Sequence, residues 1–171
     1  IDLAIRYGKG PFVGVETGAL KKDAFAPVCS PRLRLSRGED LRDAALIHVD
    51  GRRTPRPAPD WPRWCRHAGV TGVNTAAGLR FNDSLHAMQA AIAGQGVAIV
   101  SLVLASDALA SGLLVQPFRH VLSGETYHFA SAQGLGRRPD VAILRDWFRK
   151  SLAASLDGPQ RARRKTPQVS S

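Results

Sequence analysis

The chain has 171 residues, 44% of them hydrophobic and 22% charged, which is enough for one domain or two small lobes with buried cores. This composition excludes a disordered chain, and no apolar run approaches the ~20 residues that a membrane-spanning helix needs. The two cysteines, Cys29 and Cys65, lie far apart and outside any paired motif. A disulfide scaffold and a zinc site are therefore not indicated, and a reducing, cytoplasmic setting fits best.

The formal net charge of +10 is concentrated in part at the end of the chain. Residues 155–171 lack apolar periodicity and are predicted to be a disordered basic tail. A second basic group, Arg52, Arg53 and Arg56, lies in a proline-rich stretch. It indicates either a solvated loop or a patch for nucleic acid or an acidic partner.

Hydrophobic periodicity predicts the secondary structure in chain order. Strands are expected at residues 2–6, 12–17, 24–29, 45–49, 78–81, 97–100, 113–118 and 127–130. Helices are expected at 38–42, from Asp60 onward, between Ser84 and Gly94, and at 103–109 and 139–152. Pro27 favours an edge or crossover strand over a central one, because proline cannot donate to a sheet ladder. Strands that alternate with helices indicate an α/β protein with largely parallel sheets.

Two local features raise the question of a ligand. Trp61 and Trp64 are three residues apart on one helical face, which is typical of core packing, the alternative being a platform on which a ligand stacks. Gly94 and Gly96 form a G-Q-G fragment, but a dinucleotide loop needs a strand, then glycines, then a helix. Here a helix precedes and a strand follows, so the two glycines are interpreted as a helix end and a strand start.

Asn82, Asp83 and Ser84 follow a predicted strand and begin the next helix. Unpaired N–H groups there point beyond the carboxyl edge of the sheet, where open α/β sheets bind small ligands, although a plain helix cap is the default.

The sequence contains no G-x-S-x-G motif, no P-loop, no metal spacing among its histidines and no distinctive carboxylate pair. We therefore expect neither an enzyme nor a cofactor or metal site.

Six segments together resemble the effector-binding domain of LysR-type transcriptional regulators. They are DLAIRYGKG, AFAPVCSP, the DL…LIH run, GLRFNDSLHAMQAAIAGQGVAIV, LLVQPF and PDVAILRDWF. The resemblance runs from about Asp2 to about Leu152 and is greatest to the subgroup that contains the glycine-cleavage activator and the β-lactamase regulator.

This resemblance implies a periplasmic-binding-protein type 2 fold, in which two α/β lobes are joined by two crossover strands. The crossovers would be Ala24–Cys29 and Tyr127–Ser131. Residues 1–23 and 134–154 would form the first lobe, and residues 24–133 the second lobe with the crossovers at its ends. The helix-turn-helix, the linker helix and the start of the first lobe are not in the sequence. Because Ile1 has neither Met nor a signal sequence before it, we expect the true N-terminus to be missing.

The resemblance also implies a small-molecule effector between the lobes. The candidate contacts are Arg6, Tyr7, Asn82, Asp83, Ser84 and His128. Arg6 suits a carboxylate and Asp83 an ammonium group, so the hypothesis is an amino acid or peptide-like effector. The alternative is that Arg6 makes an internal ion pair and that Asp83 only caps its helix.

The expected partners follow from the family. DNA would be bound only through the absent N-terminal domain, the full-length protein would be a cytoplasmic homo-oligomer, and no membrane is expected. Two other hypotheses stay open: a free-standing solute-binding protein, which predicts an upstream signal peptide, and a fragment that binds nucleic acid through its own arginines.

Overall fold

The computed structural model describes residues 3–50 and 57–154, with side chains to residue 152. Its centre is a six-stranded sheet in the order β1-β6-β2-β5-β3-β4. The strands are β1 Leu3–Gly8, β2 Val15–Val28, β3 Leu46–Val49, β4 Leu79–Phe81, β5 Val97–Ser101 and β6 Leu122–Ala132. The α-helices are α1 Trp61–Ala68, α2 Ser84–Ile92, α3 Ser106–Ala110 and α4 Pro139–Ala154, and the 3₁₀ turns are Pro31–Leu33, Gly38–Arg42 and Leu135–Arg137. The predicted basic tail and the Arg52–Arg56 group lie outside the described residues.

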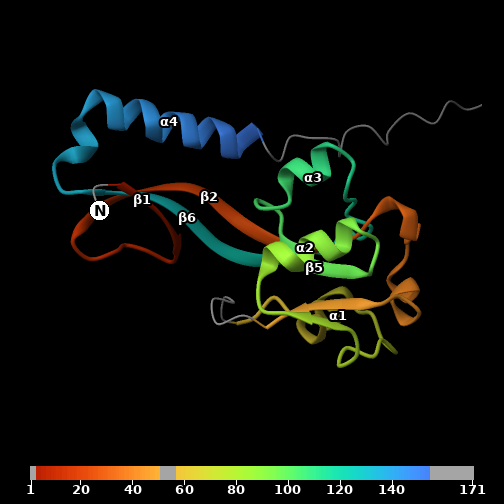
Figure 1. Cartoon of the computed structure of the whole chain (residues 1–171). Coiled ribbons are helices and arrows are strands. Elements are labelled where there is room, and N and C mark those ends of the chain that lie inside the picture. Colours follow the sequence, from red (N-terminus) through yellow and green to blue (C-terminus); the bar gives the residue numbers. More distant parts are fainter. Residues whose placement is uncertain (1–2, 51–56, 155–171) are drawn as a thin grey trace, which may run out of the picture.

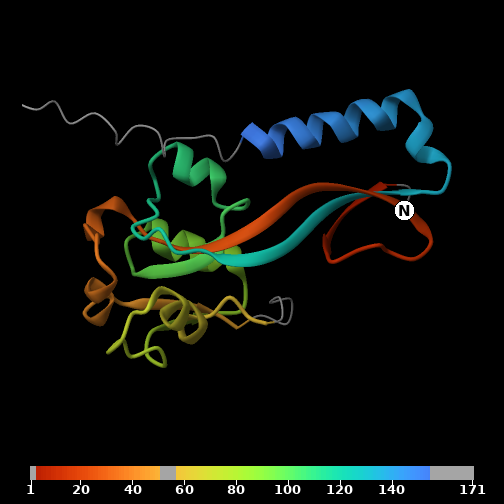
Figure 2. The same ribbon diagram turned by 180° about the vertical axis from the view of Figure 1, so that it is seen from behind.

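Two long strands, β2 and β6, run antiparallel between the two ends of the molecule (Figure 1). One end holds β1, which pairs with β6, and α4, which lies along the sheet; we call it the β1 end. The other end holds β3, β4, β5 and the three shorter helices; we call it the β5 end (Figure 2). This arrangement is the open α/β architecture that the sequence predicts.

The prediction of a largely parallel sheet is wrong for half of the molecule. β5, β3 and β4 are parallel, but β1, β6, β2 and β5 pair antiparallel in succession. The reason is that β2 leaves the β1 end and β6 returns to it, so neighbouring strands travel in opposite directions. Pattern alone does not reveal that return, because alternation in a strand is the same in both directions.

Several predicted boundaries change because pairing extends or ends a strand. Residues 15–17 of the first run and 24–28 of the second belong to one strand, β2, whereas residues 12–14 lie outside it. The pairing of β2 with β6 shifts register between Ala19 and Lys21 and between Lys22 and Ala24. Pro27 pairs with Ile99 of β5 beyond Phe25, the last residue paired with β6.

Two further elements are shorter than expected. The predicted strand at 113–118 is wrong, because only Val115 bridges to Cys29 before Pro117 interrupts the run. The helix at 103–109 is displaced to α3, since residues 102–105 form turns.

Two hydrophobic clusters cover opposite faces of the sheet at the β5 end. Ala98 and Val100 of β5 face the cluster that contains α2 and α3, whereas Val97 and Ile99 face the cluster that contains α1. A strand buried on both faces has a continuous apolar run, which is why residues 97–100 were recognisable from the sequence.

Trp61 and Trp64 are 1% and 0% exposed, with ring centroids 6.0 Å apart, so the core-packing interpretation of this pair is confirmed. Each indole N–H donates to a carbonyl, from Trp61 to Ile47 (3.0 Å) and from Trp64 to His120 (2.9 Å).

Gly94 adopts a φ of +80° just after α2, as expected for a residue that ends a helix. No helix in the described part of the chain is long and apolar enough to cross a membrane.

Candidate functional site

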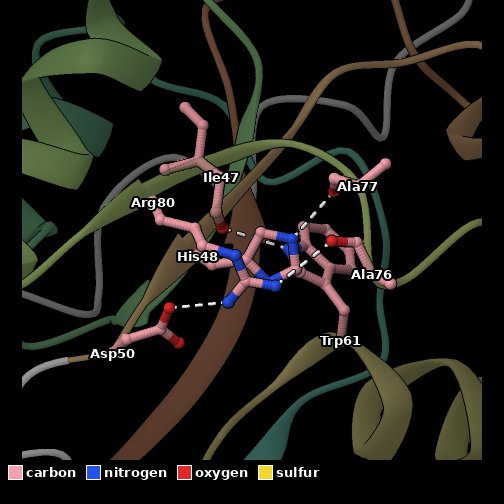
Figure 3. A network of polar contacts seen from close by, with 7 residues as sticks. All are labelled: Ile47, His48, Asp50, Trp61, Ala76, Ala77 and Arg80. Atoms are coloured by element: carbon pink, nitrogen blue, oxygen red, sulfur yellow. Dashed lines mark hydrogen bonds and ion pairs between the residues drawn. The ribbon is translucent and has the colours of Figure 1, made fainter.

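The carboxyl ends of the parallel strands β5, β3 and β4 meet at one edge of the sheet. The edge is extended by Asp50, whose N–H donates to the Phe81 carbonyl over 2.8 Å. Arg80 pairs with Asp50 at 2.6 Å and also donates to the Ala76 carbonyl. The network around this edge includes His48, whose Nε2 lies 2.9 Å from the Ala77 carbonyl oxygen (Figure 3). These contacts hold β3 and β4 in register where a ligand site is expected.

Asn82, Asp83 and Ser84 lie at this edge, at the start of α2. Asp83 is the helix cap: its Oδ1 accepts hydrogen bonds from the N–H groups of Leu85 (2.7 Å) and His86 (3.3 Å). The side chain remains half exposed, with His86 Nδ1 at 3.6 Å. The capping role that the sequence offered as the default for Asp83 is therefore present in the structure.

Arg6 and His128 form a cross-strand pair between β1 and β6. The Arg6 guanidinium lies 5.3 Å from the centroid of the Phe12 ring, and the His128 ring meets the same Phe12 ring edge to face at 5.5 Å. His128 Nε2 lies 3.1 Å from the Gly8 carbonyl oxygen. The structure thus brings two of the six predicted residues together around Phe12.

Tyr7 lies on the opposite face of the β1–β6 ribbon, because successive side chains of a strand alternate. It pairs with Tyr127, and the two ring centroids are 4.8 Å apart. Burial raises the pKa of both tyrosines, and the nearby Asp23 carboxylate adds to the rise. Among the described residues, no hydrogen bond or ion pair joins Arg6, Tyr7 or His128 to the start of α2.

Asp23 of β2, Ser101 of β5 and Tyr127 of β6 form a polar cluster that the sequence patterns did not predict. Asp23 and Ser101 are 2% and 3% exposed, although both are polar. Burial raises the pKa of Asp23. Its Oδ1 accepts a hydrogen bond from the Ala24 N–H over 2.8 Å, whereas its buried Oδ2 has no hydrogen-bond partner among the described residues. The Ser101 hydroxyl oxygen accepts a hydrogen bond from the Leu104 N–H over 3.2 Å, and its nearness to the Tyr127 hydroxyl opposes the rise in the pKa of Tyr127. The cluster links both long strands to the carboxyl end of β5.

The sequence pattern could have indicated Ser101 as a site residue, because it directly follows a predicted strand, just as Asn82 does. Asp23 had no comparable signal, since its burial depends on a contact between strands that are distant in the sequence.

A small, partly open pocket of about 20 Å³ has Gly124 in its lining. A Cβ on Gly124 would lie 3.1 Å from Asp23 Cβ, so the pocket borders this cluster. Its walls come from the two long strands, from the segment before α1 and from the first turn of α1. The lining residues are Phe25, Pro57, Pro59, Arg63, Ser123, Gly124 and Glu125. One cation and one carboxylate thus line a pocket that also has an aromatic and two proline surfaces. In the described part of the chain, no three His, Cys, Asp or Glu side chains gather as metal ligands.

The fold is that of a ligand-binding domain of the periplasmic-binding-protein type 2 class, as found in LysR effector-binding domains. Residues 1–153 match the LysR substrate binding domain model, and the chain belongs to this family. The resemblance noted from the sequence is therefore confirmed.

Relatives and solved structures agree with this assignment. The glycine cleavage system transcriptional activator of Escherichia coli strain K12 is 34% identical over 163 residues, which cover 92% of this chain and 52% of that protein. The effector domain of AmpR from Pseudomonas aeruginosa has a TM-score of 0.65 and 27% identity, covering 90% of this chain and 73% of that one. The AmpR effector-binding domain from Citrobacter freundii has a TM-score of 0.68 and 25% identity, covering 90% and 76%. The chain spans about half the length of the curated relatives it matches.

Proposed function

We propose that the chain is the effector-sensing part of a LysR-type transcriptional regulator, with the effector bound where the two long strands meet the carboxyl edge of β5, β3 and β4. The observation that carries this proposal is the buried cluster of Asp23, Ser101 and Tyr127 beside a pocket. A ligand there would touch β2 and β6, the two strands that connect the ends of the molecule, and the residues before and within α1. Its difference in affinity for two relative arrangements of the ends would shift their populations, typically with ~1–3 kcal/mol of coupling.

Further parts of the proposal rest on the family. The first lobe would comprise residues 1–23 and 134–154, and the second lobe residues 24–133. DNA binding would belong to a segment outside this sequence, the complete regulator would be a cytoplasmic homo-oligomer, and it would carry out no catalysis. The named relatives are transcriptional activators, which favours a regulator over a free-standing solute-binding protein.

We further propose an amino acid or short peptide as the effector class. Arg6 and Asp83 are the candidate partners from the sequence, and Tyr7, Asn82, Ser84 and His128 are the further candidate contacts. The pocket adds Arg63 and Glu125 as a second pair of opposite charges. Among the described residues, neither takes part in an ion pair, although Arg63 Nη1 donates to the Pro57 carbonyl over 3.0 Å. Such a pair suits the carboxylate and the ammonium group of a zwitterion.

Calorimetry on the full-length regulator that contains this chain tests the proposal, with the free amino acids and a set of di- and tripeptides as probes. We expect one probe to bind, and we expect Arg6→Ala and Asp83→Ala to weaken it at least about ten-fold, the loss of one charged contact. Arg149→Ala is the control, because Arg149 lies on the exposed side of α4 beside Asp146.

Unchanged affinity in both site variants would contradict the roles of Arg6 and Asp83. A regulator that binds none of the probes would contradict the effector class. The DNA immediately upstream of the Ile1 codon tests the regulator itself: an in-frame helix-turn-helix supports it, and a signal peptide would replace it with solute transport.

A further inference from the structure

A β-bulge interrupts the pairing of β2 with β6 where the two strands pass between the ends of the molecule. Lys22 pairs with Thr126, whereas Ala24 pairs with Ser123. One residue of β2, Asp23, therefore faces two residues of β6, Gly124 and Glu125. A bulge of this kind bends its strand and increases the local twist, so it sets the direction in which β6 continues.

The bulge removes Glu125 from the hydrogen-bond ladder between β2 and β6, and the Tyr7 hydroxyl takes the place of the missing acceptor for the Glu125 N–H. The Glu125 N–H donates to the Tyr7 hydroxyl oxygen over 2.9 Å. Tyr7 belongs to β1, whose pairing with β6 ends at Gly8 and Thr126, the residue that follows Glu125 in the chain. The Tyr7 ring packs against the Tyr127 ring, with the centroids 4.8 Å apart, and this contact fixes the position from which the Tyr7 hydroxyl reaches the bulge.

Gly124 is required by the same contact. A Cβ at this position would lie 2.8 Å from the Tyr7 hydroxyl oxygen, 2.9 Å from Phe25 Cε2 and 3.1 Å from Asp23 Cβ. Side chains from β1 and β2 thus converge on a backbone position that has room only for glycine. The bulge in β6 therefore depends on side chains from β1 and β2 as well as on its own residues.

We propose that Tyr7 is a latch. Its hydroxyl holds the Gly124–Glu125 bulge in one geometry and thereby fixes the angle between the β1 end and the β5 end. β6 begins at Leu122, near the β5 end, and pairs with β1 from Thr126 onward. The bulge lies between these two points, so it connects the two ends of the molecule along β6. When the hydrogen bond is absent, β6 can bend differently at this point. This inference does not depend on which effector binds, or on whether one binds.

Amide exchange and residual dipolar couplings of the ¹⁵N-labelled 171-residue chain test the latch. In Tyr7→Phe, which removes only the hydroxyl, we expect the Glu125 amide to exchange on the order of 5-fold faster, as for loss of one hydrogen bond. We also expect the dipolar couplings of β5 to change relative to those of β1. Tyr127→Phe is the matched control, because it removes a hydroxyl from the neighbouring ring and leaves the Tyr7–Glu125 hydrogen bond intact. It should leave Glu125 exchange within about 2-fold of the parent chain.

Gly124→Ala tests the same contact by changing the bulge and not Tyr7. Its Cβ should displace the Tyr7 hydroxyl and give the same acceleration at Glu125, and adding Tyr7→Phe should then accelerate it little further. Unchanged Glu125 exchange in Tyr7→Phe would overturn the proposal. Faster exchange with unchanged couplings between β1 and β5 would also overturn it, because the hydrogen bond would then hold the bulge without setting the angle. If Gly124→Ala does not fold, Tyr7→Phe alone decides.

Discussion

Replacing Trp64 by phenylalanine should destabilise the protein through two losses that the structure defines. The Trp64 side chain is fully buried, and its N–H donates to the His120 carbonyl across 56 residues of sequence. Its ring also packs against Phe118, with centroids 5.4 Å apart. The residue therefore joins α1 to the segment that leads into β6.

The magnitude follows from these contacts. Loss of the hydrogen bond should cost about 0.5–1.5 kcal/mol. Loss of part of the indole leaves a cavity of roughly 40 Å³, which at ~24 cal/mol per Å³ adds about 1 kcal/mol, and the lost transfer free energy adds about another 1 kcal/mol. The free energy of unfolding should fall by about 3 kcal/mol, or roughly 6–12 °C in Tm for a chain of this size.

Urea unfolding followed by far-UV circular dichroism measures this change without relying on tryptophan fluorescence. Trp147→Phe is the matched control, because Trp147 on α4 is 58% exposed and its replacement should cost less than about 0.5 kcal/mol. Equal losses in the two variants, or a loss below about 1 kcal/mol for Trp64→Phe, would refute the role given to Trp64.

Two further predictions concern Asp23 and Gly78. Burial raises the folded-state pKa of Asp23 above its ordinary 3.8, so this group stabilises the fold fully below the ordinary pKa and the contribution is lost as pH rises through the raised pKa. Asp23→Asn should therefore gain stability relative to the parent chain as the pH rises above about 3.8, and urea midpoints of the two chains that stay parallel through that rise would contradict this. Gly78 has a φ of +127°, and an added Cβ would overlap the Leu46 carbonyl oxygen, whereas Gly112 has a φ of +75° and open space around it. In thermal melts, Gly112→Ala should lower the free energy of unfolding by roughly 1–2 kcal/mol, and Gly78→Ala should lower it clearly more. Equal losses in the two variants would contradict this prediction, because they would mean that the backbone around Gly78 moves to make room for the Cβ.

Local patterns in the sequence determined many of the elements at the β5 end. The capped helix after Phe81, the apolar run at 97–100 and the glycine that ends α2 depend on neighbours within a few residues, so propensity and periodicity reveal them. The order of helix, glycine and strand excluded a nucleotide loop for the same reason. The family resemblance added the fold class, because it draws on the spacing of segments along most of the chain.

Only the tertiary structure decided the directions of the strands and the contact partners of each polar residue. Arg6 and Tyr7 are adjacent in the sequence, yet they face opposite sides of the ribbon and meet His128 and Tyr127 respectively. The burial of Asp23 and the bulge at Gly124 arise from contacts among β1, β2, β5 and β6. These contacts join residues about 80 to 120 positions apart. Their geometry depends on strand register, which no local pattern specifies because alternation is unchanged by a shift of two residues.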